Sequence, residues 1–155
     1  MKKILIVSLS LAIVAMVFSG CTQRIGDFTL ISTKNVDIGG KFKKLERYTG
    51  VDSKPMILGI PLGYPNLQQA VDNCIEAGKG DLLTNAVLEF SGWTIILYGE
   101  QKYNVKGDVW VKASTSDLYN PHIELYELRA NNAGYQLVSI LDPNKSIKVD
   151  YFTYR

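Results

Sequence analysis

The chain has 155 residues, with 17 Lys or Arg against 15 Asp or Glu, which gives a net charge of only +2. Lys2 and Lys3 account for that excess, so the rest of the chain is neutral in side-chain charge. A neutral chain without a basic run argues against nucleic acid as a partner, because such binding depends on phosphate neutralisation. Two cysteines are too few for a disulfide-rich scaffold.

The N-terminus is organised as an export signal. Lys2 and Lys3 precede an uncharged, mostly apolar run over residues 4–18. In a helix this run would rise about 22 Å, which is short of the roughly 30 Å hydrocarbon core of a bilayer. Its length is typical of a signal peptide.

Phe18-Ser19-Gly20-Cys21 follows and resembles the lipobox of bacterial lipoproteins, with Phe18 in place of the usual Leu. The resemblance implies cleavage between Gly20 and Cys21 and lipid attachment to Cys21, with palmitate among the acyl groups. Two or three acyl chains anchor a protein firmly, whereas one binds marginally. Thr22 is not the Asp that marks inner-membrane retention, so an outer-membrane location facing the periplasm is favoured in a Gram-negative host. Ordinary secretion and an uncleaved N-terminal anchor are the alternatives.

Four segments are predicted. They are a lipoprotein signal peptide at 1–20, a lipid-anchored tether at 21–27, an α+β domain at 28–112 and a β-rich extension at 113–155 packed on the same domain. Cleavage leaves 135 of the 155 residues, enough for one domain with a core. The fold class expected is α+β, an antiparallel sheet with one main amphipathic helix and a C-terminal β-hairpin.

The helix is expected over residues 66–77. Asn66 is a suitable N-cap, and Gln69 would complete a capping box. Gly78 would end the helix. An apolar stripe at helical spacing is formed by Leu67, Ala70, Val71, Cys74 and Ile75.

The remaining elements are predicted to be strands. The compact apolar run at 55–60 is expected to be a buried strand. Turns are expected at Ser91-Gly92 and at 99–102, and a linker at 113–120. Residues 123–130 are read as part of a hairpin with 135–141, with a short helix as the alternative. The other strands are expected at 28–33, 42–49, 82–90, 93–98, 103–112 and 147–154.

Few side chains are candidates for function. Cys74 lies in the apolar stripe, where a thiol behaves as a small hydrophobic group. His122 is the one histidine of the sequence, so a zinc site of the usual kind is not expected. Trp110 shares a strand face with Lys106 and Asp108 and is the candidate for contact with a partner. No catalytic set, metal or cofactor is predicted.

The stretch from residue 57 to residue 111 supports a family resemblance. Ile57-Leu58-Gly59-Ile60-Pro61-Leu62-Gly63, the helix, Gly80-Asp81 and Ile96-Leu97-Tyr98-Gly99 are similar to small, uncharacterised bacterial lipoproteins and, more loosely, to the TRL-like family. The resemblance implies an envelope lipoprotein and assigns no functional residue.

Three functions are therefore compared. The first is a non-enzymatic, lipid-anchored module with a structural role or a partner among envelope proteins. The second is a domain that binds a small ligand or glycan through Trp110. The third is an enzyme, which would need carboxylates or Cys74 to converge in a pocket.

Overall fold

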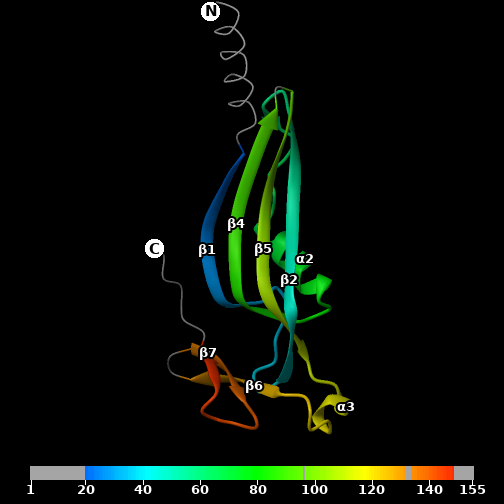
Figure 1. Cartoon of the computed structure of the whole chain (residues 1–155), viewed down its shortest axis with the longest axis vertical. Coiled ribbons are helices and arrows are strands. Elements are labelled where there is room, and N and C mark those ends of the chain that lie inside the picture. Colours follow the sequence, from blue (N-terminus) through cyan, green and yellow to red (C-terminus); the bar gives the residue numbers. More distant parts are fainter. Residues whose placement is uncertain (1–19, 96, 132–133, 149–155) are drawn as a thin grey trace, which may run out of the picture.

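One antiparallel sheet makes up most of the molecule (Figure 1). The computed structural model describes residues 20–95, 97–131 and 134–148, of which 59% lie in strands and 12% in helices. The strand order is β1-β4-β5-β2-β6-β7-β8, and β3 pairs with β2. The elements are β1 (Cys21–Ile31), β2 (Lys41–Ile57), β3 (Ile60–Pro61), α2 (Leu67–Ala77), β4 (Leu82–Ile95), β5 (Tyr98–Lys112), α3 (Thr115–Leu118), β6 (Leu125–Asn131), β7 (Gly134–Ser139) and β8 (Ser146–Lys148).

The prediction of an α+β fold is wrong, because the strands are much longer than expected. β2, β4 and β5 have 17, 14 and 15 residues. The predicted turns at Ser91-Gly92 and 99–102 lie within β4 and β5, where Gly92 is paired on both sides. A Cβ at Gly99 would lie 2.5 Å from the carbonyl oxygen of Trp93. Gly99 therefore permits a close approach of neighbouring chain rather than a turn.

The segment 21–27 is also different from its prediction as a tether. It is the first part of β1, and it pairs with β4 from Cys21 opposite Gly92 to Asp27 opposite Val87. β1 is at one edge of the sheet, and its outer side has no strand partner among the described residues.

The C-terminal hairpin is confirmed as β6 and β7, which rules out the alternative helix over 123–130. β6 continues the sheet by pairing with residues 41–43 of β2. Of the strand predicted at 147–154, residues 147–148 lie in β8 and the remainder lies outside the described residues.

Three β-bulges, in the pairings of β1 with β4, β2 with β5 and β4 with β5, curl the sheet. Two of them flank one residue of β5, since Asp108 pairs with both Arg47 and Thr84. A bulge bends its strand and increases the local twist. The bulges interrupt the pairing between Arg24 and Gly26, between Lys44 and Arg47, and between Thr84 and Val87.

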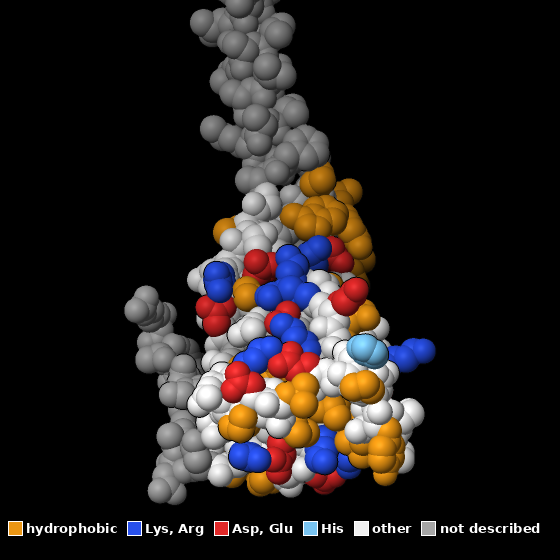
Figure 2. Space-filling view, turned by 60° about the horizontal axis from the view of Figure 1, so that its bottom comes forward, with side chains coloured by type: hydrophobic (Ala, Val, Ile, Leu, Met, Phe, Trp, Pro, Cys, Tyr) orange, Lys and Arg blue, Asp and Glu red, His pale blue; other side chains and the backbone are white. Residues whose placement is uncertain are grey.

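The convex face of the sheet carries paired charges. Lys44 Nζ lies 2.9 Å from Asp108 Oδ2, and Lys106 Nζ lies 3.6 Å from Glu89 Oε2. Figure 2 shows basic and acidic side chains interleaved across the middle of the molecule. Because the lysines are about half exposed, each pair contributes about 0.2–1 kcal/mol.

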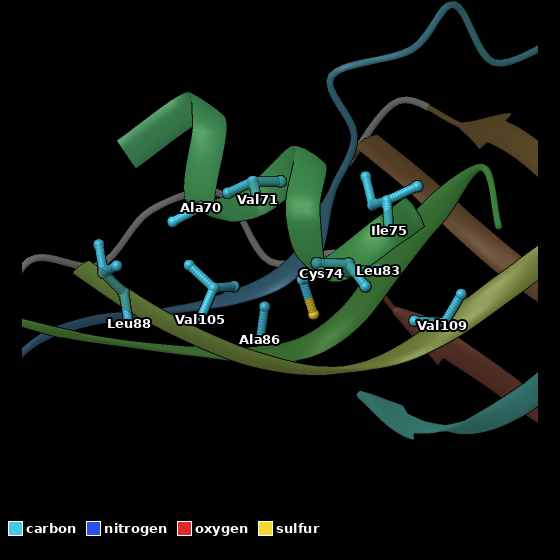
Figure 3. Close-up of a cluster of buried hydrophobic side chains, with 9 residues drawn as sticks. All are labelled: Ala70, Val71, Cys74, Ile75, Leu83, Ala86, Leu88, Val105 and Val109. Carbon is cyan, nitrogen blue, oxygen red and sulfur yellow. The ribbon is translucent and has the colours of Figure 1, made fainter. Parts of the chain in front are cut away.

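Helix α2 covers the concave face, and its apolar stripe forms the main core (Figure 3). Four helix side chains, Ala70, Val71, Cys74 and Ile75, are buried. They pack against the inward-facing residues Leu83, Ala86 and Leu88 of β4 and Val105 and Val109 of β5.

Asn66 begins α2 as predicted. Its side-chain oxygen accepts hydrogen bonds from the backbone N–H groups of Gln68 at 2.8 Å and Gln69 at 3.3 Å. The capping box is wrong, because Gln69 Nε2 donates to Asn73 Oδ1 instead. The N–H of Asn66 donates to Asp52 Oδ2 at 2.6 Å, so β2 supplies the second half of the cap.

The same helix covers the middle of β2 along the edge away from β5, between the stretches that pair with β6 and with β3. Asn73 Nδ2 donates to the carbonyl oxygen of Val51 at 2.8 Å, and Cys74 Sγ donates to that of Tyr48 at 3.3 Å. On β2, Gly50 lies between Tyr48 and Val51, and its lack of a side chain lets the helix backbone approach the strand directly. A strand side that would otherwise be open is thereby protected.

A second core cluster joins the C-terminal hairpin to the long strands. It lies on the opposite face from α2, where the indole of Trp110 contacts the Tyr126 ring edge-on at 5.0 Å between centroids. The buried members are Phe42, Leu82, Trp110, Tyr126, Leu128 and Leu137.

The stretch predicted as a linker at 113–120 contains the short helix α3. Ser114 is its N-cap, and Ser114 Oγ accepts a hydrogen bond from the Asp117 N–H. The Asp117 carboxylate accepts hydrogen bonds from Lys43 Nζ at 2.8 Å and from the Ser114 N–H at 2.9 Å. The hydrogen bond from Lys43, followed by those from Ser114, lowers the pKa of Asp117 to about 2.

Acid should therefore weaken the attachment of α3 to β2. A carboxylate with a lowered folded-state pKa stabilises the fold above its unfolded pKa of about 3.9, and this stabilisation is lost as pH falls toward the folded value. We expect urea midpoints of the purified protein to show this loss between about pH 4 and pH 2. Asp117→Asn should flatten the response over that range. A pH response identical to that of the wild type would contradict the role of Asp117.

Candidate functional site

Two β-hairpins end side by side and expose a cluster of large hydrophobic side chains. The β2–β3 hairpin turns at Leu58-Gly59, and its Ile57 pairs with Tyr98 of the β4–β5 hairpin. The Leu58 N–H donates to the Leu97 carbonyl oxygen at 2.7 Å, which joins the two turns. We call this cluster the apolar tip, consisting of Ile57, Leu58, Ile60, Ile95 and Leu97.

The side chains of the apolar tip are exposed to solvent. Leu58, Ile60 and Leu97 are 65%, 64% and 59% exposed. Figure 2 shows hydrophobic side chains gathered at the upper end of the described surface, beyond the interleaved charges. The prediction of a buried strand at 55–60 is therefore wrong. A contiguous exposed apolar patch marks a surface that contacts a partner or a membrane.

The backbone at Leu58 is unfavourable for its side chain. Leu58 and Gly59 have φ values of 52° and 76°, as in a two-residue hairpin turn of type I′. Asn, Asp or Gly is favoured at the position that Leu58 occupies. A left-handed backbone costs a residue with a Cβ about 1–2 kcal/mol. The chain thus keeps a large apolar side chain at the end of the hairpin against a local cost.

Aromatic and charged residues border the apolar tip. Trp93 and Tyr98 contact each other edge-on, with 5.6 Å between ring centroids. Trp93 Nε1 donates to Glu100 Oε2 at 3.4 Å. The first basic residues behind the tip are Lys54 on β2 and Lys102 on β5. The surface therefore changes from apolar to aromatic to charged along the strands.

Cys21 lies beside this border. It pairs with Gly92, the residue before Trp93. A Cβ built on Gly20 would lie 3.6 Å from Trp93 Cβ, so the chain enters the sheet against that side chain. The Cys21 thiol is exposed, which makes it accessible to chemical modification.

A cleft of about 320 Å³ with a mixed polar and apolar lining lies elsewhere on the sheet, next to the bulges. Its charged groups are engaged with one another or with backbone. Arg24 Nη2 lies 2.6 Å from Asp27 Oδ1, and Arg47 Nη2 donates to the Asn85 carbonyl oxygen at 3.1 Å. Because these groups are paired in this way, they are not arranged as a free nucleophile in contact with a base.

Asp108, behind the cleft, is held as a carboxylate. Its burial raises the pKa, but hydrogen bonds from Lys44 and Asn85 and the charges of Lys44 and Arg47 outweigh burial, so the pKa is below its ordinary value. An acid with a lowered pKa is a poor proton donor at neutral pH. Asp108 therefore serves as the counter-ion of two basic side chains.

Within the described ranges, no group of three or more His, Cys, Asp and Glu side chains is arranged to hold a metal ion. No helix in the described part of the chain is long and apolar enough to cross a membrane.

Trp110 does not form the surface expected of it. The side chain is fully buried, and its Nε1 donates to Thr84 Oγ1 at 2.9 Å. The strand alternation placed it on the face of Asp108 correctly, but the hairpin β6–β7 covers that end of the face. The prediction that Trp110 contacts a partner is therefore wrong.

The other two candidates have structural roles. Cys74 is buried in the main core, and this burial raises the pKa of its thiol, which disfavours the reactive thiolate. His122 is exposed in a turn in which Asn120 Oδ1 accepts its backbone N–H at 3.0 Å. Neither side chain is brought together with a second catalytic group.

Residues at the apolar tip were missed because a continuous apolar run favours a buried strand. A signal was nevertheless present. Residues 55–65 and 90–99 contain no charged residue, and each run includes a glycine. Two charge-free runs that each contain a turn indicate exposed hairpin ends as well as buried strands.

Comparisons with known proteins give no further assignment: no family model, curated protein or solved structure matches this chain.

Proposed function

We propose that the chain is a lipid-anchored protein of the bacterial cell envelope, with a binding or structural role rather than an enzymatic one. In this proposal residues 1–20 are the signal peptide and Cys21 carries the lipid. An outer-membrane location facing the periplasm follows in a Gram-negative host.

The position of Cys21 is the observation that carries the proposal. Cys21 is the first residue of β1, is exposed, and lies at the end of the sheet where the large apolar side chains gather. A lipid on Cys21 would therefore hold a folded domain at the membrane without a spacer. The resemblance of Ser19-Gly20-Cys21 to a lipobox supports the same residue.

The polar groups support a role other than catalysis. An enzyme would need carboxylates that converge in a pocket, whereas Asp108 is paired with Lys44 and Glu124 with Lys145. Asp81 Oδ2 accepts the backbone N–H of Lys112. Trp110, the residue through which the glycan-binding alternative was expected to act, is buried.

Metabolic labelling with palmitate in the native host tests the anchor. Wild-type protein should be labelled and recovered with membranes, and Cys21→Ser should lose the label. Cys74→Ala is the matched control, because Cys74 is the other cysteine of the sequence and is buried. This control should keep the label. Label retained in Cys21→Ser, or absent from the wild type, would overturn the proposal.

A further inference from the structure

We infer that the apolar tip inserts into the lipid bilayer beside the acylated Cys21, so that the domain stands on the membrane at two points. This inference rests on the proposed function, because the lipid on Cys21 brings the tip to the membrane. It adds a second contact, made by side chains rather than by the acyl group.

The distances along the strands fit such an arrangement. Cys21 is level with Gly92, and β4 continues three residues further to Ile95. At about 3.3 Å per residue, the tip extends about 10 Å beyond Cys21. Side chains that enter the boundary between headgroups and acyl chains reach a depth of about 5–10 Å. With the Cys21 sulfur at the headgroup level, the apolar tip lies at that boundary.

The order of side chains also matches a membrane interface. Leu58 and Leu97 are at the ends of the turns, the Trp93 and Tyr98 rings lie at their border, and Lys54 and Lys102 come next. Trp and Tyr are enriched where headgroups meet acyl chains. Lysines behind them can extend their ammonium groups to anionic headgroups.

The conformation of Leu58 is independent support. Asn at this position would adopt the positive φ at a lower cost, and its polar side chain would be better solvated by water. An exposed leucine held at a positive φ is a local cost that folding alone does not explain. Contact of Leu58 with acyl chains explains why an apolar side chain is kept there.

Tryptophan fluorescence in vesicles tests the inference, because one tryptophan lies beside the apolar tip and the other lies in the core. Trp93 is at the border of the tip, whereas Trp110 is buried in the second core cluster. The mature, full-length protein is purified, its acylation is verified by mass, and it is reconstituted into phosphatidylethanolamine–phosphatidylglycerol vesicles with and without brominated acyl chains. We expect brominated chains to quench the Trp93 emission, and the quenched part to be absent in Trp93→Phe.

The variant Leu58→Asn separates membrane contact from folding. We expect Leu58→Asn to raise the urea midpoint of the purified protein, because the turn is relieved, and to reduce quenching by brominated lipid. Leu141→Asn is the matched control, since Leu141 is exposed in the turn between β7 and β8 and is not part of the tip. It should leave quenching unchanged.

The outcomes are distinct. Acylated protein whose Trp93 is quenched by iodide from water, and not by brominated lipid, would overturn the inference while the anchor stands. Quenching by neither agent would mean that a second copy or another protein covers the tip, and would also overturn it. Protein without a lipid on Cys21 would instead overturn the proposed function.

Discussion

Replacing Gly50 by alanine should lower the free energy of unfolding by about 3 kcal/mol or more. A Cβ at this position would lie 2.1 Å from the backbone nitrogen of Cys74 and 2.2 Å from the carbonyl oxygen of Ala70. Both contacts are with helix backbone, so no side-chain rotation can relieve them. The helix would have to move away from β2, which would open the main core and break the hydrogen bonds that Asn73 and Cys74 make to β2.

The matched control for this variant is Gly26→Ala. A Cβ at Gly26 would meet nothing within 4 Å, and the residue does not have a positive φ. We expect its effect to remain within about 0.5 kcal/mol. Urea unfolding of the purified proteins, followed by circular dichroism, measures both values. Equal stability of Gly50→Ala and Gly26→Ala would show that α2 does not pack on β2 as described.

Truncation of Trp110 to alanine should have the other large effect, about 3–5 kcal/mol. The side chain is fully buried, fills the second core cluster and contacts the Tyr126 ring. Its loss would leave a cavity between the long strands and the hairpin β6–β7. Trp110→Phe keeps an aromatic ring but leaves the buried Thr84 hydroxyl without its donor, which should cost about 1–3 kcal/mol.

Trp93→Phe is the control for these substitutions. Trp93 is 36% exposed, and phenylalanine keeps most of its apolar surface. We expect a change within about 0.5 kcal/mol by the same urea measurement. A Trp110→Ala protein as stable as Trp93→Phe would be incompatible with the second core cluster. That result would instead support the exposed position that the strand alternation predicted for Trp110.

Local signals in the sequence predicted the elements that depend on local chemistry. The stripe from Leu67 to Ile75 gave the helix and its buried face, and Asn66 gave its start. The hairpin β6–β7 followed from two β-prone runs around a turn. The information for the helix lies within a few helical turns, and that for the hairpin lies in one β-turn and the residues beside it.

Features that depend on distant pairing were not predicted. Nothing near Gly92 shows that it is paired on both sides, with β1 and with β5, so a glycine that looked like a turn lies inside a strand. Likewise, Trp110 is on the expected face, but a hairpin from further along the chain covers it. The identity of Cys21 as a candidate came from the sequence, whereas its position beside the apolar tip needed the fold.

The position of β1 determines how the domain would respond to pulling on the lipid proposed for Cys21. Cys21 is the first residue of an edge strand, and the strand runs from the end of the molecule that bears the apolar tip. Tension on the lipid would therefore act along β1 and load its ladder with β4 in shear. Antiparallel hydrogen bonds lie perpendicular to the strands. The bonds from Cys21 to Ile31 would thus share the force together, instead of opening one after another as in peeling. A domain built in this way would resist mechanical unfolding when it is pulled through Cys21.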